Sequence, residues 1–333
     1  MGAPSQQWED RIGRRLKLRD LHILASVVRW GSMAKAASHL AMSQPAVSES
    51  IGNLEGLLRV RLLDRSSRGV EPTLYAKALL RRADIVFDEL RQAVGELEHL
   101  ADRTVGEVRV ACGDTMAAGL LPEVIDRFTR RHPGIVVRVV QANADTLDFR
   151  ELRERQVDLA LARISTSVTD GDLDIEVLLE DRHRIVAGMH SPWVRRRKMA
   201  LSELVDEPWV FAANHFIREL IADAFASQGL PMPQERVSAN SILLRNQLLA
   251  TGRFLTVLPD SVLHFNARHW GLKALPIELG VKLRPAAIVT LKGRTLSAVA
   301  GFFIEHVRAV AQTWGPPARG QQGDGRRRMT SGP

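Results

Sequence analysis

The chain has 333 residues, of which 45% are hydrophobic and 25% are charged, and its formal net charge is +8. This composition is ordinary for a globular protein, and the length is sufficient for two or three domains. No run of about 18 apolar residues occurs, so no membrane span is expected. Residues 1–16 lack the apolar stretch of a secretory signal. The single cysteine, Cys112, excludes an internal disulfide and favours a reducing cytoplasm.

The positive charge is concentrated near the N-terminus. Residues 1–82 contain 14 Lys and Arg against 7 Asp and Glu, whereas residues 83–102 contain 1 against 6. Clustered cations raise the affinity for phosphate backbones, so this basic segment indicates a polyanionic partner. A generally basic protein with a solvated surface is the alternative interpretation.

Residues 17–55 carry the pattern of three short helices. Ser32 and Ser43 stand where N-cap hydroxyls are expected, and Pro45 follows in the first turn of the third helix, where its missing N–H costs nothing. The third helix is expected to extend to residue 63, with an apolar face formed by Val47, Ile51 and Leu54. Small residues between the second and third helices permit a close crossing, which is typical of a helix-turn-helix. A plain helical hairpin is the alternative.

A hairpin and a long helix are predicted next. Residues 64–73 combine short apolar ends with a polar, glycine-containing tip, which predicts a β-hairpin wing, and Thr73 is expected to cap the following helix. Residues 74–102 predict one helix whose apolar side chains repeat in heptads, namely Leu79, Ala83, Val86, Leu90, Ala93, Leu97 and Leu100. Heptad spacing is typical of a coiled coil, so this helix is expected to pair with a second copy of the chain. A helix lying on its own domain is the alternative.

From residue 103 the predicted strands and helices alternate, which favours an α/β fold with mostly parallel sheets. Strands are predicted at 106–111, 135–141, 157–162, 175–180, 183–189, 208–212, 236–239, 254–258 and 283–291. Helices are predicted at 116–130, 147–155, 216–228, 241–251 and 296–313. Two chain crossings divide the region into a first lobe, of about 103–163 and 270–314, and a second lobe, of about 164–269. Residues 315–333 lack an apolar pattern and are expected to be disordered.

The segment GSMAKAASHLAMSQPAVSESIGNLEGLLRVRLLDRSSRGVEPT, followed by a long helix and a two-lobed region, resembles the LysR-type transcriptional regulators. Its VSESI form is similar to the branch that includes galactose-related and β-ketoadipate-pathway regulators. The resemblance implies a flexible tail over 1–16, a winged helix-turn-helix over 17–73, a dimerising linker helix over 74–102, and an effector domain like a periplasmic binding protein over 103–314.

The resemblance also implies partners. It implies double-stranded DNA with an interrupted palindrome, a small-molecule inducer that alters the DNA bend, and tetramers built from two dimers. RNA polymerase is a candidate partner. By position in the motif, contacts with DNA are expected at Gln44, Pro45, Ser48 and Arg65. Further candidates for DNA contact are Ser32, Lys35, Ser43, Glu49 and Arg68.

Three residues depart from the pattern of the family. Arg59 replaces the usual glycine at the end of the helix, and Leu63 replaces the usual phenylalanine. Glu49 stands where Arg or Lys is frequent, and its carboxylate can either accept a hydrogen bond from cytosine N4 or repel phosphate. Its role is therefore left open.

In an open α/β sheet, ligands bind beyond the carboxyl ends of the strands. The loops at these ends supply the expected effector contacts, namely Gly113, Asp114, Thr115, Arg163, Ser165, Asn214, His215, Arg218 and Ser241. Thr115 begins a helix whose free N–H groups suit an oxyanion. It is the first choice, because the resemblance implies that a Ser or Thr at this position contacts the inducer, and capping of the helix is its alternative role. Arg163 is alternatively paired with Asp158 or Glu176. Arg245 could face either the cleft or solvent.

Other functions find less support. The sequence has no G-x-S-x-G elbow, P-loop, H-E-x-x-H motif or Cys/His zinc spacing, so neither catalysis nor a metal or other cofactor is expected. Cys112 is interpreted as a small buried residue instead of an oxidant sensor, because no second cysteine is present to resolve it. The effector is expected to be a small carboxylate or a sugar. The alternative function is a two-lobed solute-binding or small-molecule enzyme module without a DNA role.

Overall fold

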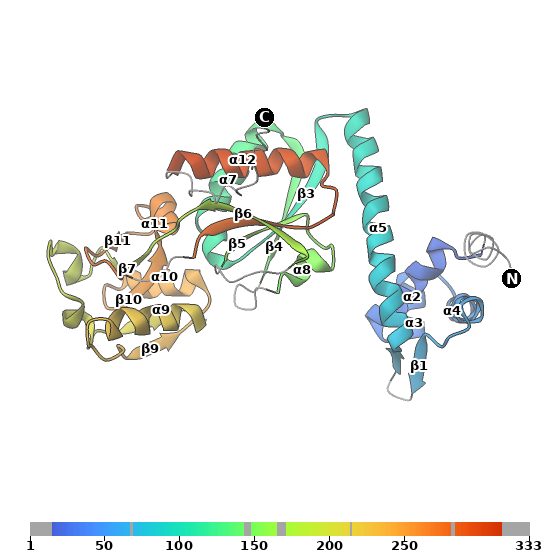
Figure 1. The fold of residues 1–333 in the computed structure, drawn as a ribbon, viewed down its shortest axis with the longest axis horizontal. Coiled ribbons are helices and arrows are strands. Elements are labelled where there is room, and N and C mark those ends of the chain that lie inside the picture. Colours follow the sequence, from blue (N-terminus) through green and yellow to red (C-terminus); the bar gives the residue numbers. More distant parts are fainter. Residues whose placement is uncertain are drawn as a thin grey trace, which may run out of the picture. The chain divides into compact units, whose positions relative to one another are not determined.

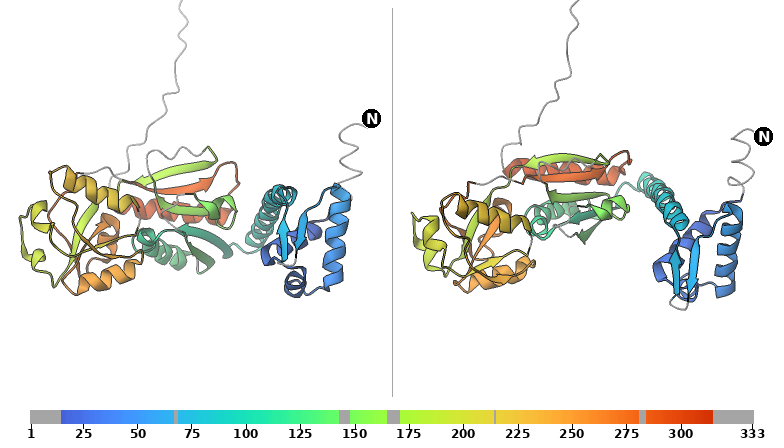
Figure 2. Two further views of the ribbon diagram at one scale, coloured as in Figure 1. Left: turned by 90° about the horizontal axis from the view of Figure 1, so that it is seen from below. Right: turned by 60° about the horizontal axis from the view of Figure 1, so that its bottom comes forward.

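The computed structural model describes residues 15–66, 69–142, 148–164, 171–213, 215–280 and 284–314. The chain divides into two compact units, Met1–Ala93 and Val94–Pro333, and each is described by itself (Figures 1 and 2). The predicted tails, 1–16 and 315–333, lie outside the described residues except for residues 15 and 16. Among the helices described, none combines the length and the apolar character needed to cross a bilayer.

The first unit is a bundle of three helices followed by a two-stranded antiparallel hairpin. The elements are α2 (Leu18–Trp30), α3 (Met33–His39), α4 (Gln44–Leu58), β1 (Leu63–Ser66) and β2 (Gly69–Pro72). The predicted helix starts are confirmed, because the Ser32 hydroxyl accepts from the Lys35 N–H at 3.4 Å and the Ser43 hydroxyl accepts from the Ala46 N–H at 3.3 Å. The core contains fully buried side chains, among them Leu24, Val27, Ala36, Val47 and Ile51.

Helix α4 ends at Leu58, before the predicted residue 63. Arg59 follows with a φ of 57°, a left-handed conformation that favours glycine. The Glu55 carboxylate stabilises the turn, because it accepts hydrogen bonds from the backbone N–H groups of Leu62 at 2.7 Å and Leu63 at 3.2 Å. The spacing of apolar residues does not indicate this helix end, because the turn depends on the contact between the Glu55 side chain and the backbone.

Helix α5 (Leu74–Ala101) confirms the predicted long helix and has 28 residues. The Thr73 hydroxyl caps it by accepting from the Ala76 N–H at 3.3 Å, as the sequence predicts. Ala76 and Ala83 are buried against the three-helix bundle. Leu79 is half-buried in the same cluster. Further along the heptad pattern, four large apolar side chains are exposed to solvent in the single chain, namely Val86, Leu90, Leu97 and Leu100, which we call the heptad stripe.

The second unit contains two lobes, each built on a five-stranded sheet. The first lobe has the strand order β4-β3-β5-β12-β6, and its strands are β3 (Val105–Cys112), β4 (Gly134–Gln141), β5 (Leu159–Arg163), β6 (Leu173–Leu179) and β12 (Ala286–Leu291). Strand β12 runs antiparallel to both of its neighbours. The helices are α6 (Asp114–Ala117), α7 (Leu120–Arg131), α8 (Arg150–Arg153) and α12 (Ala298–Trp314). Helices α7 and α12 pack together on the sheet (Figure 1).

The second lobe has the strand order β11-β7-β10-β8-β9. Its strands are β7 (His183–Gly188), β8 (Trp209–Phe211), β9 (Glu235–Ser238), β10 (Leu255–Pro259) and β11 (Leu272–Ala274). Its helices are α9 (His215–Ala226), α10 (Ile242–Ala250) and α11 (Asp260–Asn266), with two short 3-10 helices, η2 (Pro192–Arg195) and η3 (Leu201–Leu204). The predicted two-lobed α/β architecture is therefore confirmed. The prediction of mostly parallel sheets is wrong, because two of the four strand pairings in each five-stranded sheet are antiparallel.

The chain passes between the lobes at positions that differ from the predicted crossings near residues 163 and 270. Strand β6 pairs with β12 in the first lobe, so the first crossing falls after Leu179. Strand β11 pairs with β7 in the second lobe, so the second crossing falls after Ala274. An apolar pattern identifies a strand but not its neighbour, because pairing depends on residues far apart in the sequence.

Two predicted helices also differ from the structure. The helix predicted over 116–130 is divided at Gly119 into α6 and α7. The chain passes so closely there that a Cβ at Gly119 would lie 2.9 Å from the carbonyl oxygen of Thr115. The helix predicted over 147–155 contracts to the four residues of α8. Short α11 and β11 were not indicated by the sequence pattern.

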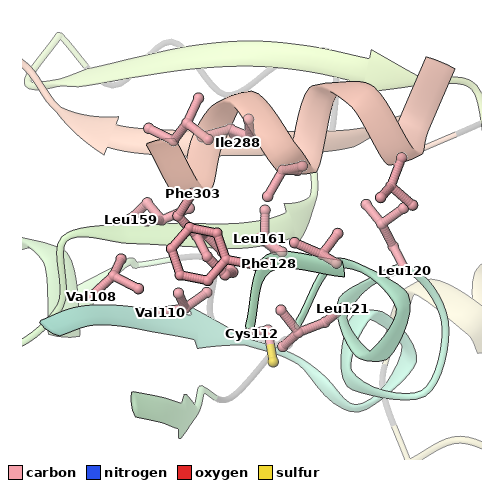
Figure 3. Packing of buried hydrophobic residues seen from close by; sticks show 14 of the residues in the cluster. Val108, Val110, Cys112, Leu120, Leu121, Phe128, Leu159, Leu161, Ile288 and Phe303 are labelled. Atoms are coloured by element: carbon pink, nitrogen blue, oxygen red, sulfur yellow. The ribbon is translucent and has the colours of Figure 1, made fainter. Parts of the chain in front are cut away.

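The core of the first lobe lies between its sheet and helices α7 and α12 (Figure 3). The rings of Phe128 and Phe303 meet edge to face, with centroids 5.1 Å apart. Fully or almost fully buried strand residues surround them, including Val108, Leu159 and Ile288. This packing fixes the strands and so determines where the loops at their carboxyl ends lie.

Replacing Phe128 with Ala is expected to lower the free energy of unfolding by about 3–5 kcal/mol, because it leaves a cavity between α7 and α12. Urea unfolding followed by tryptophan fluorescence measures the change. The control is Val136→Ala on β4, where the side chain is 50% exposed and the loss should stay within about 0.5 kcal/mol. Equal losses in the two variants would contradict this account of the core.

Candidate functional site

The structure exposes most of the residues expected to contact DNA on α4. Ser43, Gln44, Pro45 and Glu49 are exposed at the N-terminal end of the helix, and Ser48 is half-buried. In a helix-turn-helix, the first residues of the second helix are those that reach base edges in the major groove. The polar surface of α4 therefore lies on the part of the helix that such binding requires.

The remaining predicted DNA contacts come from α3 and the wing. Lys35 is exposed and Ser32 is half-buried at the start of α3. Arg65 is exposed on β1, while Arg68 lies outside the described residues. The elements that precede and follow α4 in the chain, α3 and the hairpin, therefore each carry an exposed cationic side chain.

The wing is attached firmly to the helices. The Val70 N–H donates to the Gly31 carbonyl at 3.0 Å, and a Cβ at Gly69 would lie 2.8 Å from the same oxygen. Gly69 also has a φ of 127°, which favours glycine. This close approach fixes the hairpin that carries Arg65 relative to the start of α3.

A cavity of about 240 Å³ lies between the two lobes of the second unit. It lies at the carboxyl ends of β3 and β5, where Gly113 and Arg163 form part of its wall. The second lobe contributes His183 and Arg245. Apolar side chains form much of the remaining wall, including Met116, Phe149, Leu152, Phe216, Ile217 and Val257.

Arg163 is held by a buried network. Its guanidinium forms an ion pair with the Asp181 carboxylate, and donates to the hydroxyls of Thr115 at 3.2 Å and Ser261 at 2.9 Å. Asp181 also accepts from the Ser261 backbone N–H at 3.0 Å. Thr115 does not cap α6, because the N-cap position belongs to Gly113. Both lobes and the first crossing contribute to this network.

The sequence alternatives for Arg163 are wrong. Asp158 is bound instead by the Arg109 guanidinium at 2.6 Å. Glu176 is bound by the Arg308 guanidinium at 2.7 Å. Both carboxylates therefore have arginine partners other than Arg163. Arg163 itself forms part of the cavity wall and pairs with Asp181.

Two further polar side chains are buried in the cavity wall. His183 is buried with no hydrogen bond to its Nδ1 among the described residues. Burial, aided by the nearby Arg163 charge, lowers the pKa of His183 to about 3, so the ring is neutral. Arg245 is 3% exposed, and burial lowers its pKa to about 10 while the Asp114 charge opposes this shift. Arg245 lines the cavity, and with this pKa it stays protonated at neutral pH.

Only some of the other predicted effector contacts lie in the cavity wall. Gly113 and His215 line the cavity, and the exposed His215 Nε2 lies 2.9 Å from the Glu219 carboxylate. Ser165 and Asn214 lie outside the described residues.

Three predicted contacts do not line the cavity. Asp114 accepts a hydrogen bond from the Gln141 amide, and Arg218 forms an ion pair with Glu235. The Ser241 hydroxyl caps α10. Each of these polar groups is therefore used within the fold.

Sequence reasoning missed several residues of the site. Asp181, Ser261 and His183 were not selected, although Asp181 and His183 are polar residues between apolar strands at the first crossing. Arg284 was also missed, and its guanidinium lies 3.7 Å from the centroid of the Phe216 ring. The signal in the sequence that could have identified Asp181 and His183 was their position as isolated polar residues at a strand boundary.

Cys112 lines the cavity but is buried. Burial raises the pKa of its thiol to about 11, with the Asp114 charge as a second cause. The thiol is therefore protonated at neutral pH and a poor nucleophile, which agrees with the interpretation of a small buried residue. Within the described ranges, no group of three or more His, Cys, Asp or Glu converges as a metal site.

A helix-turn-helix with a wing, followed by a two-lobed domain with an internal cavity, defines a ligand-responsive DNA-binding transcriptional regulator. Residues 18–77 match the family described as bacterial regulatory helix-turn-helix protein, lysR family, and residues 101–312 match the LysR substrate binding domain. The chain therefore belongs to the LysR family of transcriptional regulators, as the sequence predicts, and is not an enzyme.

Several known proteins are similar over nearly the whole chain. The HTH-type transcriptional regulator GbpR of Azospirillum brasilense is 28% identical over 90% of this chain and 88% of its own length. PcaQ of Agrobacterium fabrum is 25% identical over 90% of this chain and 96% of its own length. The structure of full-length CbnR complexed with its target DNA has a TM-score of 0.64 and 20% identity, covering 89% of this chain and all of that chain. This structural likeness shows a shared fold.

Acid is expected to destabilise the protein through His183. The unfolded chain binds a proton at this histidine below a pKa of about 6.5, whereas the folded ring stays neutral down to about 3. The free energy of unfolding should therefore fall by up to about 1.4 kcal/mol per pH unit as the pH drops below about 6.5. Urea unfolding at a series of pH values measures this slope. His183→Gln should show a shallower slope, and His190→Gln, at an exposed position, should match the wild type. Equal slopes in all three proteins would contradict the assignment.

Proposed function

We propose that this protein acts in the cytoplasm as a regulator that binds an interrupted palindrome near its promoters, with a small-molecule inducer in the cavity between the lobes. The observation that carries the proposal is the exposed polar first turn of α4, in the same unit as a wing anchored to Gly31. That surface is suited to base edges and phosphates. The cavity in the second unit supplies a place where a metabolite can bind.

The DNA contacts divide by chemistry. Gln44 has an amide that can pair with adenine in the major groove, and Glu49 has a carboxylate that can accept from cytosine N4. Lys35 and Arg65 are exposed cations suited to phosphates or to a minor groove. Gln44 and Glu49 would therefore recognise the base sequence, whereas Lys35 and Arg65 would position the helix-turn-helix unit on the DNA backbone.

The heptad stripe supports pairing of two chains through α5. Its exposed apolar side chains repeat every seven residues, which matches the packing of a coiled coil. Pairing would cover the stripe and hold two heads at a set spacing, as a site with two-fold symmetry requires. Two such dimers would form the tetramer, and RNA polymerase is a candidate partner at the promoter.

The inducer would act by favouring one arrangement of the lobes. A ligand shifts an equilibrium only by its difference in affinity for the two states. The cavity is formed by both lobes, so its shape depends on how they are arranged. A ligand bound there would thereby change the packing of dimers and the bend of the DNA.

A footprint on the DNA upstream of the gene encoding this chain tests the proposal. Protection of two half-sites about one helical turn apart, or a multiple of it, is expected at low salt, with loss of binding as salt rises. Absence of protection at low salt would overturn it. Altered spacing of cleavage after addition of a bound metabolite would support the change in bend.

Arg65→Ala should weaken binding to all duplexes and reduce the salt slope by about one per head, because one phosphate contact is lost. Gln44→Ala should instead change base preference, with about 1–3 kcal/mol less discrimination at one position. Gel shifts with a set of single-base variants over a range of salt separate the two effects. Arg195→Ala, an exposed arginine of the second lobe, is the charge-matched control and should bind as the wild type. Identical behaviour of all three variants would refute these roles.

Leu97→Glu should convert the dimer to monomers and weaken operator binding by about tenfold or more, because a charge in the heptad stripe cannot be buried in a coiled coil. Sedimentation and gel shifts measure the two effects. Leu243→Glu is a matched control, since Leu97 is 66% exposed on α5 and Leu243 is 67% exposed on α10. Dimers that persist in Leu97→Glu would show that α5 is not the pairing surface.

A further inference from the structure

Arg245 is the most unusual polar side chain of the cavity. It is 3% exposed on α10, and its Nε is buried without a hydrogen-bond partner among the described residues. A buried charge is costly unless it is paired and hydrogen-bonded. Such a group in the wall of a cavity is suited to a ligand that supplies the missing partner.

The contrast with Arg163 identifies which cation is available. Arg163 lines the same cavity but is neutralised by Asp181 and also donates to Thr115 and Ser261. No described residue accepts a hydrogen bond from Arg245 in this way. The carboxylate that favours its charge, Asp114, accepts a hydrogen bond from Gln141 instead.

Among the described residues of the wall, the other charged side chains are less buried: Asp148 and Glu219 are exposed, Glu151 is half-buried, and the half-buried Arg284 lies over the Phe216 ring. His183 is neutral, and its unpartnered Nδ1 can form one hydrogen bond. Glu219 lies at an exposed position beside His215. The buried wall is therefore matched by one negative group on the ligand and one additional polar atom.

The apolar part of the wall decides between an acid and a sugar. Its apolar side chains include Met116, Phe149, Leu152, Phe216 and Val257. A sugar presents hydroxyl groups on most sides, and each would need a partner when desolvated. At about 240 Å³ the cavity is smaller than a usual drug-sized pocket, so a compact ligand with an apolar body fits it better.

We propose that the effector of this protein is a small organic monocarboxylate with an apolar body, whose carboxylate binds the Arg245 guanidinium while a second polar atom reaches His183. The inference rests on the proposed function, since it names the ligand class of the same cavity. It also replaces the sequence-based choice of Arg218, which is paired with Glu235 outside the cavity wall.

Isothermal titration of the full-length protein tests the charge requirement. The probes are benzoate and hexanoate, their neutral counterparts benzamide and hexanamide, and D-galactose. At least one acid should bind, and it should bind at least about tenfold more tightly than its amide, because charge-assisted hydrogen bonds are the stronger ones. Binding of neither acid at millimolar concentration, equal binding of acid and amide, or binding of galactose alone overturns the proposal.

Variants assign the acid to Arg245. Arg245→Gln should weaken binding of the acid by about tenfold or more, and Arg245→Lys, which retains the charge, should weaken it less. Arg253→Gln removes one exposed charge from the same lobe and should bind the acid as the wild type does. Acid binding that is unchanged in Arg245→Gln, or lost equally in Arg253→Gln, overturns the assignment.

Melting curves of the ligand-free proteins distinguish loss of a ligand contact from loss of fold. Arg245→Gln should melt at the same or a higher temperature than the wild type, because it removes a buried charge without a hydrogen-bonded partner. A lower melting temperature would mean that Arg245 has a structural partner, and would overturn the proposal. Failure of the DNA footprint with intact acid binding would instead contradict the proposed function alone.

Discussion

The buried ion pair between Arg163 and Asp181 connects the two lobes of the second unit. Arg163 ends a strand of the first lobe, Asp181 lies in the crossing, and Ser261 belongs to the second lobe. Each group is hydrogen-bonded to more than one partner, as burial of charge requires. The network thus joins the lobes at one side of the cavity and directs Thr115 into the same place.

Local features could be predicted from the sequence, whereas long-range contacts could not. The caps at Ser32, Ser43 and Thr73 were predictable because each hydroxyl binds an N–H three residues away. The partner of Arg163 could not be chosen by nearness in sequence, since carboxylates at 158, 176 and 181 are all close along the chain. Only strand pairing decides among them, and the pairing of β6 and β12 joins residues more than a hundred positions apart.

The residues of the candidate site were likewise predicted only in part. Gly113, Thr115 and Arg163 were found because ligands gather at the carboxyl ends of strands, a rule that needs only the strand boundaries. Arg218 was selected and Arg245 was left open, whereas the structure places Arg245 in the cavity wall and pairs Arg218 with Glu235. The sequence does not show which face of each helix is covered. The wing was predicted, but its attachment to Gly31 depends on two backbones coming close in space.

The exposed leucines of α5 have a consequence for dosage in the cell. A chain that covers its apolar stripe only with a second copy obeys mass action, so the fraction of paired chains depends on the amount of protein synthesised. Well below the dissociation constant of the pair, the concentration of two-headed molecules rises with the square of the chain concentration. A modest change in expression would then be amplified at the operator before any metabolite is bound.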